Sequence, residues 1–272
     1  MSALRVAVVQ FPGVNCEDET VRALQRAGLA GEIFGWTRPA AGLREFHAYV
    51  LPGGFSWQDR VRAGALSAKD PLMLTLIEEV EGRGKPVLGI CNGAQVLVET
   101  GLVPGGGTVE LALARNHMPG RGGYLARWVH VRVEASCCVF TRALAPGTVL
   151  PLPVAHGEGR FASRDPVRLA RLRGAGQMPL RYVTADGRDA CDFPDNPNGS
   201  AEGAAAVCSA KGNALAMMPH PERALDLGQV SRCVAGEWAE RRQRAGEAGT
   251  LAAEAGPGLV LFEGLRRHLE ES

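Results

Sequence analysis

The chain has 272 residues, of which 46% are hydrophobic and 22% are charged, and this near-average globular composition excludes a wholly disordered or fibrous protein. Its formal net charge of +1 gives no overall attraction to nucleic acid or to an anionic membrane, and no apolar run approaches the roughly 18 residues that a membrane-spanning helix needs. We therefore expect neither nucleic acid nor a membrane as a partner.

The first hundred residues alternate between predicted strands and predicted helices. Strands are predicted at residues 4–11, 31–36, 47–51 and 86–90, and helices at 16–27, 71–81 and 94–100. This alternation predicts an α/β fold with a parallel sheet flanked by helices, whose ligands lie beyond the C-terminal ends of the strands. Functional residues are therefore expected directly after Phe11, Leu51 and Ile90.

Beyond Gly101 the pattern becomes rich in short strands, which we expect to extend the first sheet in an antiparallel manner. Strands are predicted at residues 127–133, 149–156, 180–184, 205–209 and 214–218. The polar, Ala- and Gly-rich stretch 241–258 is interpreted as a loop or a loose helix end, and residues 259–271 as an amphipathic helix. Because no linker, repeat or boundary interrupts the chain, residues 1–272 are expected to form a single domain.

Compartment and metal content are predicted from the N-terminus and the cysteines. The N-terminus lacks the features of a signal peptide. The seven cysteines are odd in number, scattered and without a CxxC pair, which is typical of reduced thiols in the cytoplasm. Neither the cysteines nor the six histidines show the spacing of metal ligands, so we expect no metal site.

The strongest chemical signal is the sequence G-I-C-N-G at residues 89–93, between a predicted strand and a predicted helix. It matches a nucleophile elbow with cysteine in place of serine, in which the glycines permit a sharp turn. Cys91 would stand at the N-terminus of a helix, where the dipole favours the thiolate, and the N–H of Asn92 would face a developing oxyanion. The alternative is a buried cysteine at the end of a core strand.

A base and its orienting partner are predicted in the sequence M-P-H-P-E-R at residues 218–223. In an extended segment His220 and Glu222 would project to the same side, so the carboxylate could hold the imidazole in one tautomer. The alternative is a surface turn in which Glu222 pairs with Arg223.

Glycine makes up 35 of the 272 residues, about twice the usual fraction, and Gly53 and Gly54 directly follow a predicted strand. Adjacent glycines at such a strand end let a backbone N–H turn toward a ligand, which would supply a second oxyanion donor. The pattern P-G-G alone most often marks a simple turn.

Together these segments resemble the class I (triad) glutamine amidotransferases. More narrowly, the chain is similar to the glutaminase subunits of phosphoribosylformylglycinamidine synthase, a purine-biosynthetic enzyme. The narrower resemblance rests on the segments F-P-G-V-N-C at 11–16, R-A-G-A at 62–65, L-P-V-A-H-G-E-G-R-F at 152–161 and N-P-N-G-S at 196–200.

The resemblance implies a flavodoxin-like fold, with Cys91 as nucleophile and His220 and Glu222 completing the triad. It places Gly54, next to Gly53, and Asn92 at the oxyanion hole and Gln95 in the wall of the glutamine pocket.

It also implies hydrolysis of L-glutamine, with the ammonia passing to a large synthetase subunit assisted by a small accessory subunit. That partner would use ATP and Mg²⁺; this chain has no P-loop, and no cofactor is expected in it. The alternatives are a glutaminase serving another synthetase and a catalytically silent relative.

The chain departs from the family pattern at three places. W-Q-D-R at residues 57–60 replaces the usual Y-G-D-Y, residues 115–120 match only in part, and the region after Arg223 is longer. His156 and Glu158, in the H-G-E-G segment, are given no role, because such a loop is equally suited to holding structure or contacting a partner.

Overall fold

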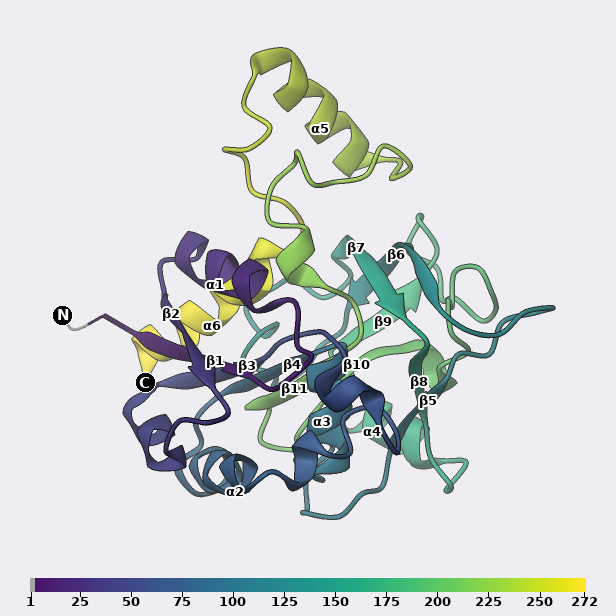
Figure 1. Ribbon diagram of the computed structural model, residues 1–272. Coiled ribbons are helices and arrows are strands. Elements are labelled where there is room, and N and C mark those ends of the chain that lie inside the picture. Colours follow the sequence, from purple (N-terminus) through teal and green to yellow (C-terminus); the bar gives the residue numbers. More distant parts are fainter. Residues whose placement is uncertain (1–2) are drawn as a thin grey trace.

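Nine strands form one central sheet within residues 3–272, the part of the chain that the computed structural model describes (Figure 1). They are β1 (Arg5–Gln10), β2 (Ala30–Gly35), β3 (Ala48–Leu51), β4 (Val87–Ile90), β6 (Leu125–Val133), β7 (Val149–His156), β9 (Leu180–Val183), β10 (Ala204–Cys208) and β11 (Ala214–Met217). Their order is β2-β1-β3-β4-β11-β10-β9-β6-β7. Two further strands, β5 (Ala112–Arg115) and β8 (Glu158–Ala162), pair separately.

The sheet has a parallel half and an antiparallel half. Strands β2, β1, β3, β4 and β11 are parallel, in the order typical of flavodoxin-like folds. From β11 onward, β10, β9, β6 and β7 continue the sheet in antiparallel pairs. Every residue of β3 and β4 is buried, as expected of strands covered on both faces. This arrangement confirms the predicted α/β class and its antiparallel extension.

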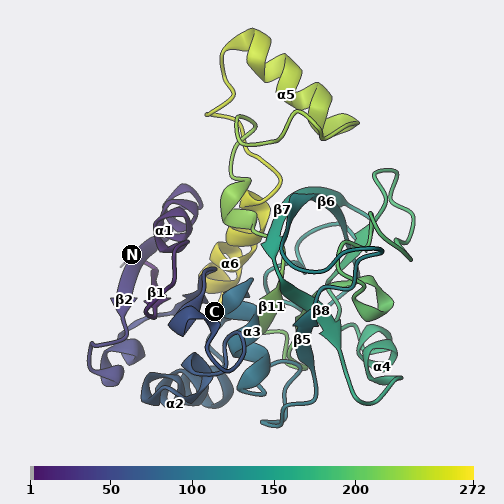
Figure 2. The same cartoon turned by 45° about the vertical axis from the view of Figure 1, so that its right-hand side comes forward.

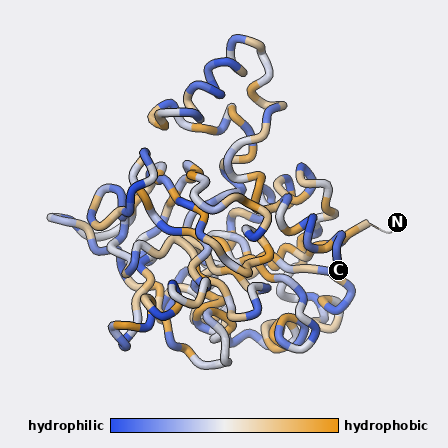
Figure 3. The backbone as a smooth tube through the Cα atoms, turned by 180° about the vertical axis from the view of Figure 1, so that it is seen from behind, coloured by the Kyte–Doolittle hydropathy of each residue, from blue (hydrophilic) through white to orange (hydrophobic). Residues whose placement is uncertain are grey.

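Helices cover both faces of the parallel half (Figure 1). Helices α1 (Glu17–Arg26) and α6 (Leu259–Glu271) lie on one face, and α2 (Pro71–Ile77) and α3 (Asn92–Glu99) lie on the other. The Asp70 side chain accepts a hydrogen bond from the N–H of Leu72 and so caps α2. The apolar core lies between these layers, and Figure 3 shows hydrophobic chain concentrated in the interior.

The stretch 241–258 differs from its sequence interpretation. Most of its first half belongs to a regular helix, α5 (Glu237–Ala248), which stands away from the body of the molecule (Figures 1 and 2). The Ala, Arg, Glu and Gln residues of this segment are good helix formers, and Gly249 ends the helix at a φ of 72°. Trp238 holds the arm to the body, because its indole N–H donates to the carbonyl of Val149 at 3.2 Å.

Other predicted elements agree with the structure to within a few residues. Helix α2 ends earlier than predicted and continues as a π-helical turn over Glu78–Gly82. Strands β5 and β8 and the short helix α4 (Arg168–Gly174) were not predicted. Within residues 3–272, no helix combines the length and the apolar character that crossing a membrane requires.

Candidate active site

Cys91 occupies a sharp turn between β4 and α3 with a φ of 50° and a ψ of −103°. Such a conformation is strained for a residue with a side chain, and the surrounding packing imposes it. A Cβ at Gly93 would lie 1.9 Å from the carbonyl oxygen of Leu51, and one at Gly89 would lie 2.5 Å from that of Gly93. Both glycines are therefore sterically required, which confirms the predicted strand–turn–helix element.

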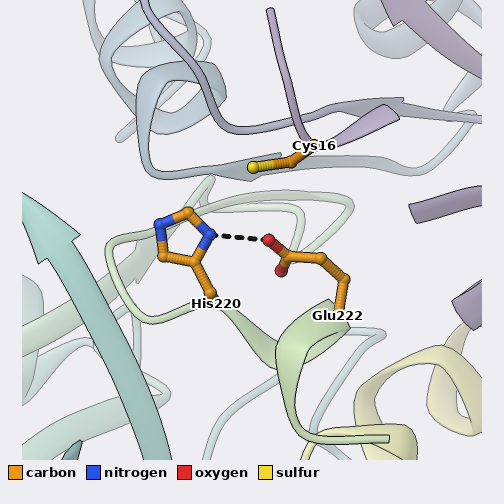
Figure 4. Close-up of side chains that lie close together, drawn as sticks. All are labelled: Cys16, His220 and Glu222. Carbon is orange, nitrogen blue, oxygen red and sulfur yellow. Dashed lines mark hydrogen bonds and ion pairs between the residues drawn. The ribbon is translucent and has the colours of Figure 1, made fainter. Parts of the chain in front are cut away.

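His220 and Glu222 follow β11 and meet through a hydrogen bond of 2.6 Å between Nδ1 and Oε1 (Figure 4). They do so in a different local conformation from the predicted extended one, because Pro221–Arg223 form a 3-10 turn. The segment is thus a turn with Arg223 3.8 Å from Glu222, but it does not lie at the surface, since His220 is 2% exposed and Glu222 is fully buried. The N–H of His220 is fixed by the carbonyl of Pro153 at 2.8 Å.

The charge on His220 is controlled by its neighbours. Burial lowers the pKa of the imidazole, but Glu222, and after it Cys91 and Cys16, outweigh this effect and hold the pKa well above its usual value. Because Glu222 engages Nδ1, Nε2 is the ring nitrogen that is left to contact another partner. That atom has no hydrogen-bond partner among the described residues.

The Cys91 thiol lies in the same buried region. Cys91 is 5% exposed, and its Sγ is 3.6 Å from the carbonyl oxygen of Ala155. The hydroxyl of Tyr124 donates to the same carbonyl at 2.9 Å. Tyr124 and Phe55 are both about half exposed and their rings lie 6.3 Å apart, so an aromatic pair stands at the edge of the site.

The loop after β3 packs directly on His220. A Cβ at Gly53 would lie 2.8 Å from Cε1 of His220, and one at Gly54, which has a φ of 150°, would lie 2.6 Å from Cα of Val14. Gly54 and Val14 form an isolated antiparallel β-bridge. The hydrogen bonds of this bridge use the carbonyl of Gly53 and the N–H of Phe55, so they do not involve the N–H of Gly54. The P-G-G segment is therefore part of the site and more than a simple turn.

Asn92 and Gln95 connect this loop to the elbow and to a neighbouring cavity. Asn92 Oδ1 accepts from the N–H of Ser56 at 3.1 Å, and its Nδ2 donates to Gln95 Oε1 at 2.9 Å. Gln95 Nε2 in turn donates to the carbonyl of Glu158 at 2.7 Å. Gln95 and Glu158 line a cavity of about 210 Å³ together with Arg62 and Arg115.

His156 belongs to a buried network of hydrogen bonds around Asn116. Its Nδ1 lies 3.0 Å from Asn116 Oδ1, which also accepts from the N–H of Gly159 at 3.2 Å. Burial, with a smaller contribution from His220, lowers the pKa of His156 to about 3, so the ring is neutral near pH 7. The Glu158 side chain is partly exposed beside Arg115, with 3.8 Å between Oε1 and the arginine Nε.

Cys16 was missed as a site residue. It directly precedes α1, and its Sγ accepts a hydrogen bond from Nη2 of Arg223 at 2.9 Å, although 207 residues separate the two. Figure 4 shows Cys16 beside the imidazole of His220. The sequence placed Cys16 at the start of a predicted helix and at the end of the segment F-P-G-V-N-C; nothing in it connects the cysteine to His220.

Within residues 3–272, one group of side chains has the geometry of a possible metal site: Cys16, His220 and Glu222. Their potential ligand atoms lie within 4.8 Å of one another. Spacing along the chain gave no sign of this cluster. Nδ1 and Oε1 bond to each other and Sγ bonds to Arg223, whereas Nε2 of His220 and Oε2 of Glu222 have no hydrogen-bond partner among the described residues.

Comparison with known proteins adds independent findings. Residues 3–263 match the family model of the CobB/CobQ-like glutamine amidotransferase domain. The PurQ subunit of phosphoribosylformylglycinamidine synthase from Methanothrix thermoacetophila is 43% identical over 98% of this chain and 99% of its own length. The corresponding subunit from Thermus thermophilus is 46% identical over 82% of this chain and 91% of its own. A solved chain of PurLQS from Thermotoga maritima superposes with a TM-score of 0.71 at 30% identity, covering 98% of this chain and 99% of that one.

Proposed function

This chain belongs to the CobB/CobQ-like glutamine amidotransferase family, among the PurQ subunits of phosphoribosylformylglycinamidine synthase, and from that premise we propose that it hydrolyses L-glutamine at Cys91. Cys91 is the nucleophile, His220 transfers protons at Nε2, and Glu222 holds the imidazole at Nδ1. The N–H groups of Gly54 and Asn92 form the oxyanion hole, and Gln95, which is hydrogen-bonded to Asn92, contributes to the wall of the glutamine pocket.

The reaction proceeds through a thioester. The Cys91 thiolate attacks the side-chain carbonyl carbon of glutamine, and the two N–H groups stabilise the resulting oxyanion. The carbon–nitrogen bond breaks as the His220 imidazolium gives its proton to the departing nitrogen, which leaves as ammonia. Water, deprotonated by His220, then attacks the thioester, and glutamate leaves while the thiolate and imidazolium are restored.

One observation carries this assignment. Cys91 at a strained elbow, the buried His220–Glu222 pair and the Gly53–Gly54 loop come from three separate segments and converge at the C-terminal edge of the parallel strands. A buried structural cysteine has no need of a positive φ beside a histidine whose Nε2 is unpartnered.

The ammonia is consumed by a partner. The Thermotoga maritima relative was solved as PurLQS, which supports assembly of this chain with a PurL synthetase and a PurS accessory subunit. The synthetase would use ATP and Mg²⁺ to convert formylglycinamide ribonucleotide to the amidine. The chain acts as one amidotransferase domain, and its free thiols suit a reducing cytoplasm.

The test is glutamate release from glutamine by the chain combined with its synthetase and accessory subunits. Wild type is expected to turn over, Cys91→Ala to lose at least about 10³-fold in kcat, and Cys233→Ala, at an exposed cysteine, to remain active. A glutamine-analogue electrophile should label Cys91 alone. Turnover by Cys91→Ala equal to that of wild type would contradict the assignment.

A further inference from the structure

Arg223 lies beside Glu222, and no step of the proposed reaction uses it. Its Nε is 3.8 Å from Glu222 Oε1, the same oxygen that bonds to His220. The arginine side chain is 38% exposed, so in the absence of an anchor its guanidinium would be free to turn into solvent. A positive charge at this position disfavours protonation of His220, because the two cations repel each other and share one carboxylate.

Cys16 supplies that anchor. Its Sγ accepts from Nη2 of Arg223 at 2.9 Å and donates to Asn15 Oδ1 at 3.3 Å, so both hydrogen-bonding capacities of a neutral thiol are used. The N–H of Cys16 donates to the carbonyl of Gly53 at 3.2 Å. Cys16 is 1% exposed and thus joins the start of α1, the Gly53–Gly54 loop and Arg223 in one fixed arrangement.

We propose that Cys16 and Arg223 are positioning residues of the glutaminase site: Cys16 holds the Arg223 guanidinium against Glu222, and this cation keeps the His220 imidazolium acidic enough to protonate the leaving ammonia. The proposal rests on the function proposed above and adds a regulator of the base. It explains why a thiol, an arginine and the triad carboxylate lie together beside His220. Figure 4 shows Cys16, His220 and Glu222 of this group.

The direction of the effect follows from the groups around His220. The titratable and charged groups that act on it or border it are Cys16, Cys91, Tyr124, His156, Glu222 and Arg223. Glu222 is the main group that raises the pKa of His220. Removing the positive charge of Arg223 leaves the effect of Glu222 less opposed. The pKa of His220 therefore rises further, and the imidazolium becomes a weaker acid.

The experiment compares Cys16→Ala, Cys16→Ser, Arg223→Gln and Arg223→Lys in the complex with the synthetase and accessory subunits. Two readouts are used: the pH dependence of kcat and KM for glutamine, and the pKa of His220 measured by ¹⁵N-histidine NMR, which needs no turnover. Cys233→Ala and Arg244→Gln, at an exposed cysteine and an exposed arginine, are the matched controls.

Arg223→Gln should move the alkaline limb of kcat and the pKa of His220 upward by about one pH unit and lower kcat near pH 7 about 10-fold, with KM little changed. Cys16→Ala also removes a group that raises the pKa of His220, so its upward shift should be smaller than that of Arg223→Gln. Cys16→Ser, which retains an acceptor, and Arg223→Lys, which retains the charge, should restore most of both. An unmoved His220 pKa in Arg223→Gln overturns the proposal, as does an equal loss of kcat in Cys16→Ser and Cys16→Ala at all pH values. A wild-type complex that released no glutamate would instead contradict the proposed function, and the NMR readout would still decide the role of Cys16.

Discussion

Nδ1 of His220 and Oε1 of Glu222 lie 2.6 Å apart in a region where Glu222 is fully buried and His220 nearly so. A carboxylate removed from water needs a charged or hydrogen-bonded partner, and the imidazole supplies it. The pair therefore favours the imidazolium even though burial alone would favour the neutral ring. Several consequences for activity and stability can be measured.

Replacing Glu222 by Gln removes the main group that raises the pKa of His220. Burial then dominates, so this pKa should fall and the alkaline limb of kcat should move to lower pH, opposite in sign to the effect of Arg223→Gln. The wrong tautomer should also become accessible, lowering kcat by about 10² to 10⁴. Glutamate release by the complex from pH 6 to pH 10 measures both, with the exposed Glu247→Gln as control. An unchanged alkaline limb of kcat in Glu222→Gln would contradict the proposed role of Glu222 in the triad.

Gly54→Ala tests the oxyanion hole. Its Cβ would lie 2.6 Å from Cα of Val14, so the loop must shift and carry the N–H of Gly54 away from the substrate carbonyl. Loss of one such donor typically lowers kcat by about 10² to 10³. Gly174→Ala adds the same methyl group where no atom lies within 4 Å and should leave the steady-state kinetics unchanged. Equal kinetics for the two variants would refute this role of Gly54.

His156 should make the protein less stable as pH falls. Its folded-state pKa of about 3 lies below the ordinary value of 6.5, so between these values the unfolded chain binds more protons than the folded one. The free energy of unfolding should therefore decrease from about pH 6.5 downward, by up to roughly 1.4 kcal/mol per pH unit. Urea unfolding at pH 7 and pH 5 should show a smaller difference in His156→Gln than in wild type. His117→Gln, at an exposed histidine, should show the wild-type difference.

Asp59 should have the opposite effect on stability. Burial, with a contribution from Glu158, raises the pKa of its carboxyl to about 6 from 3.8, so the folded chain binds more protons than the unfolded one between these values. Stability from this group is present at low pH and is lost as pH rises through 6. Asp59→Asn, which can still accept from Asn92 Nδ2, should raise the free energy of unfolding at pH 7.5 more than at pH 4.5. Urea unfolding at the two pH values measures this difference. A larger loss in the free energy of unfolding of Asp59→Asn at pH 7.5 than at pH 4.5 would contradict the prediction.

Local features of the fold were predictable because local sterics determine them. Short apolar runs bounded by Gly, Pro and Asn marked the strands of the central sheet, and residues 259–271 were predicted as the helix that the structure contains. Helix α5 was not predicted as a regular helix, because it buries only Ala245 and its hydrophobic periodicity is weak. Strands β5 and β8 were missed because each is short and pairs only with the other.

The sequence by itself determined the sharp turn at Cys91 and brought His220 close to Glu222, since the glycines flanking Cys91 and a spacing of two residues act over a few bonds. Only the tertiary structure decided that these segments meet, that the Gly53–Gly54 loop packs on His220, and that His156 is neutral. The same holds for Cys16, which reaches Arg223 from 207 residues away. Burial and through-space charge set the chemistry of this site, and both depend on which strands lie side by side.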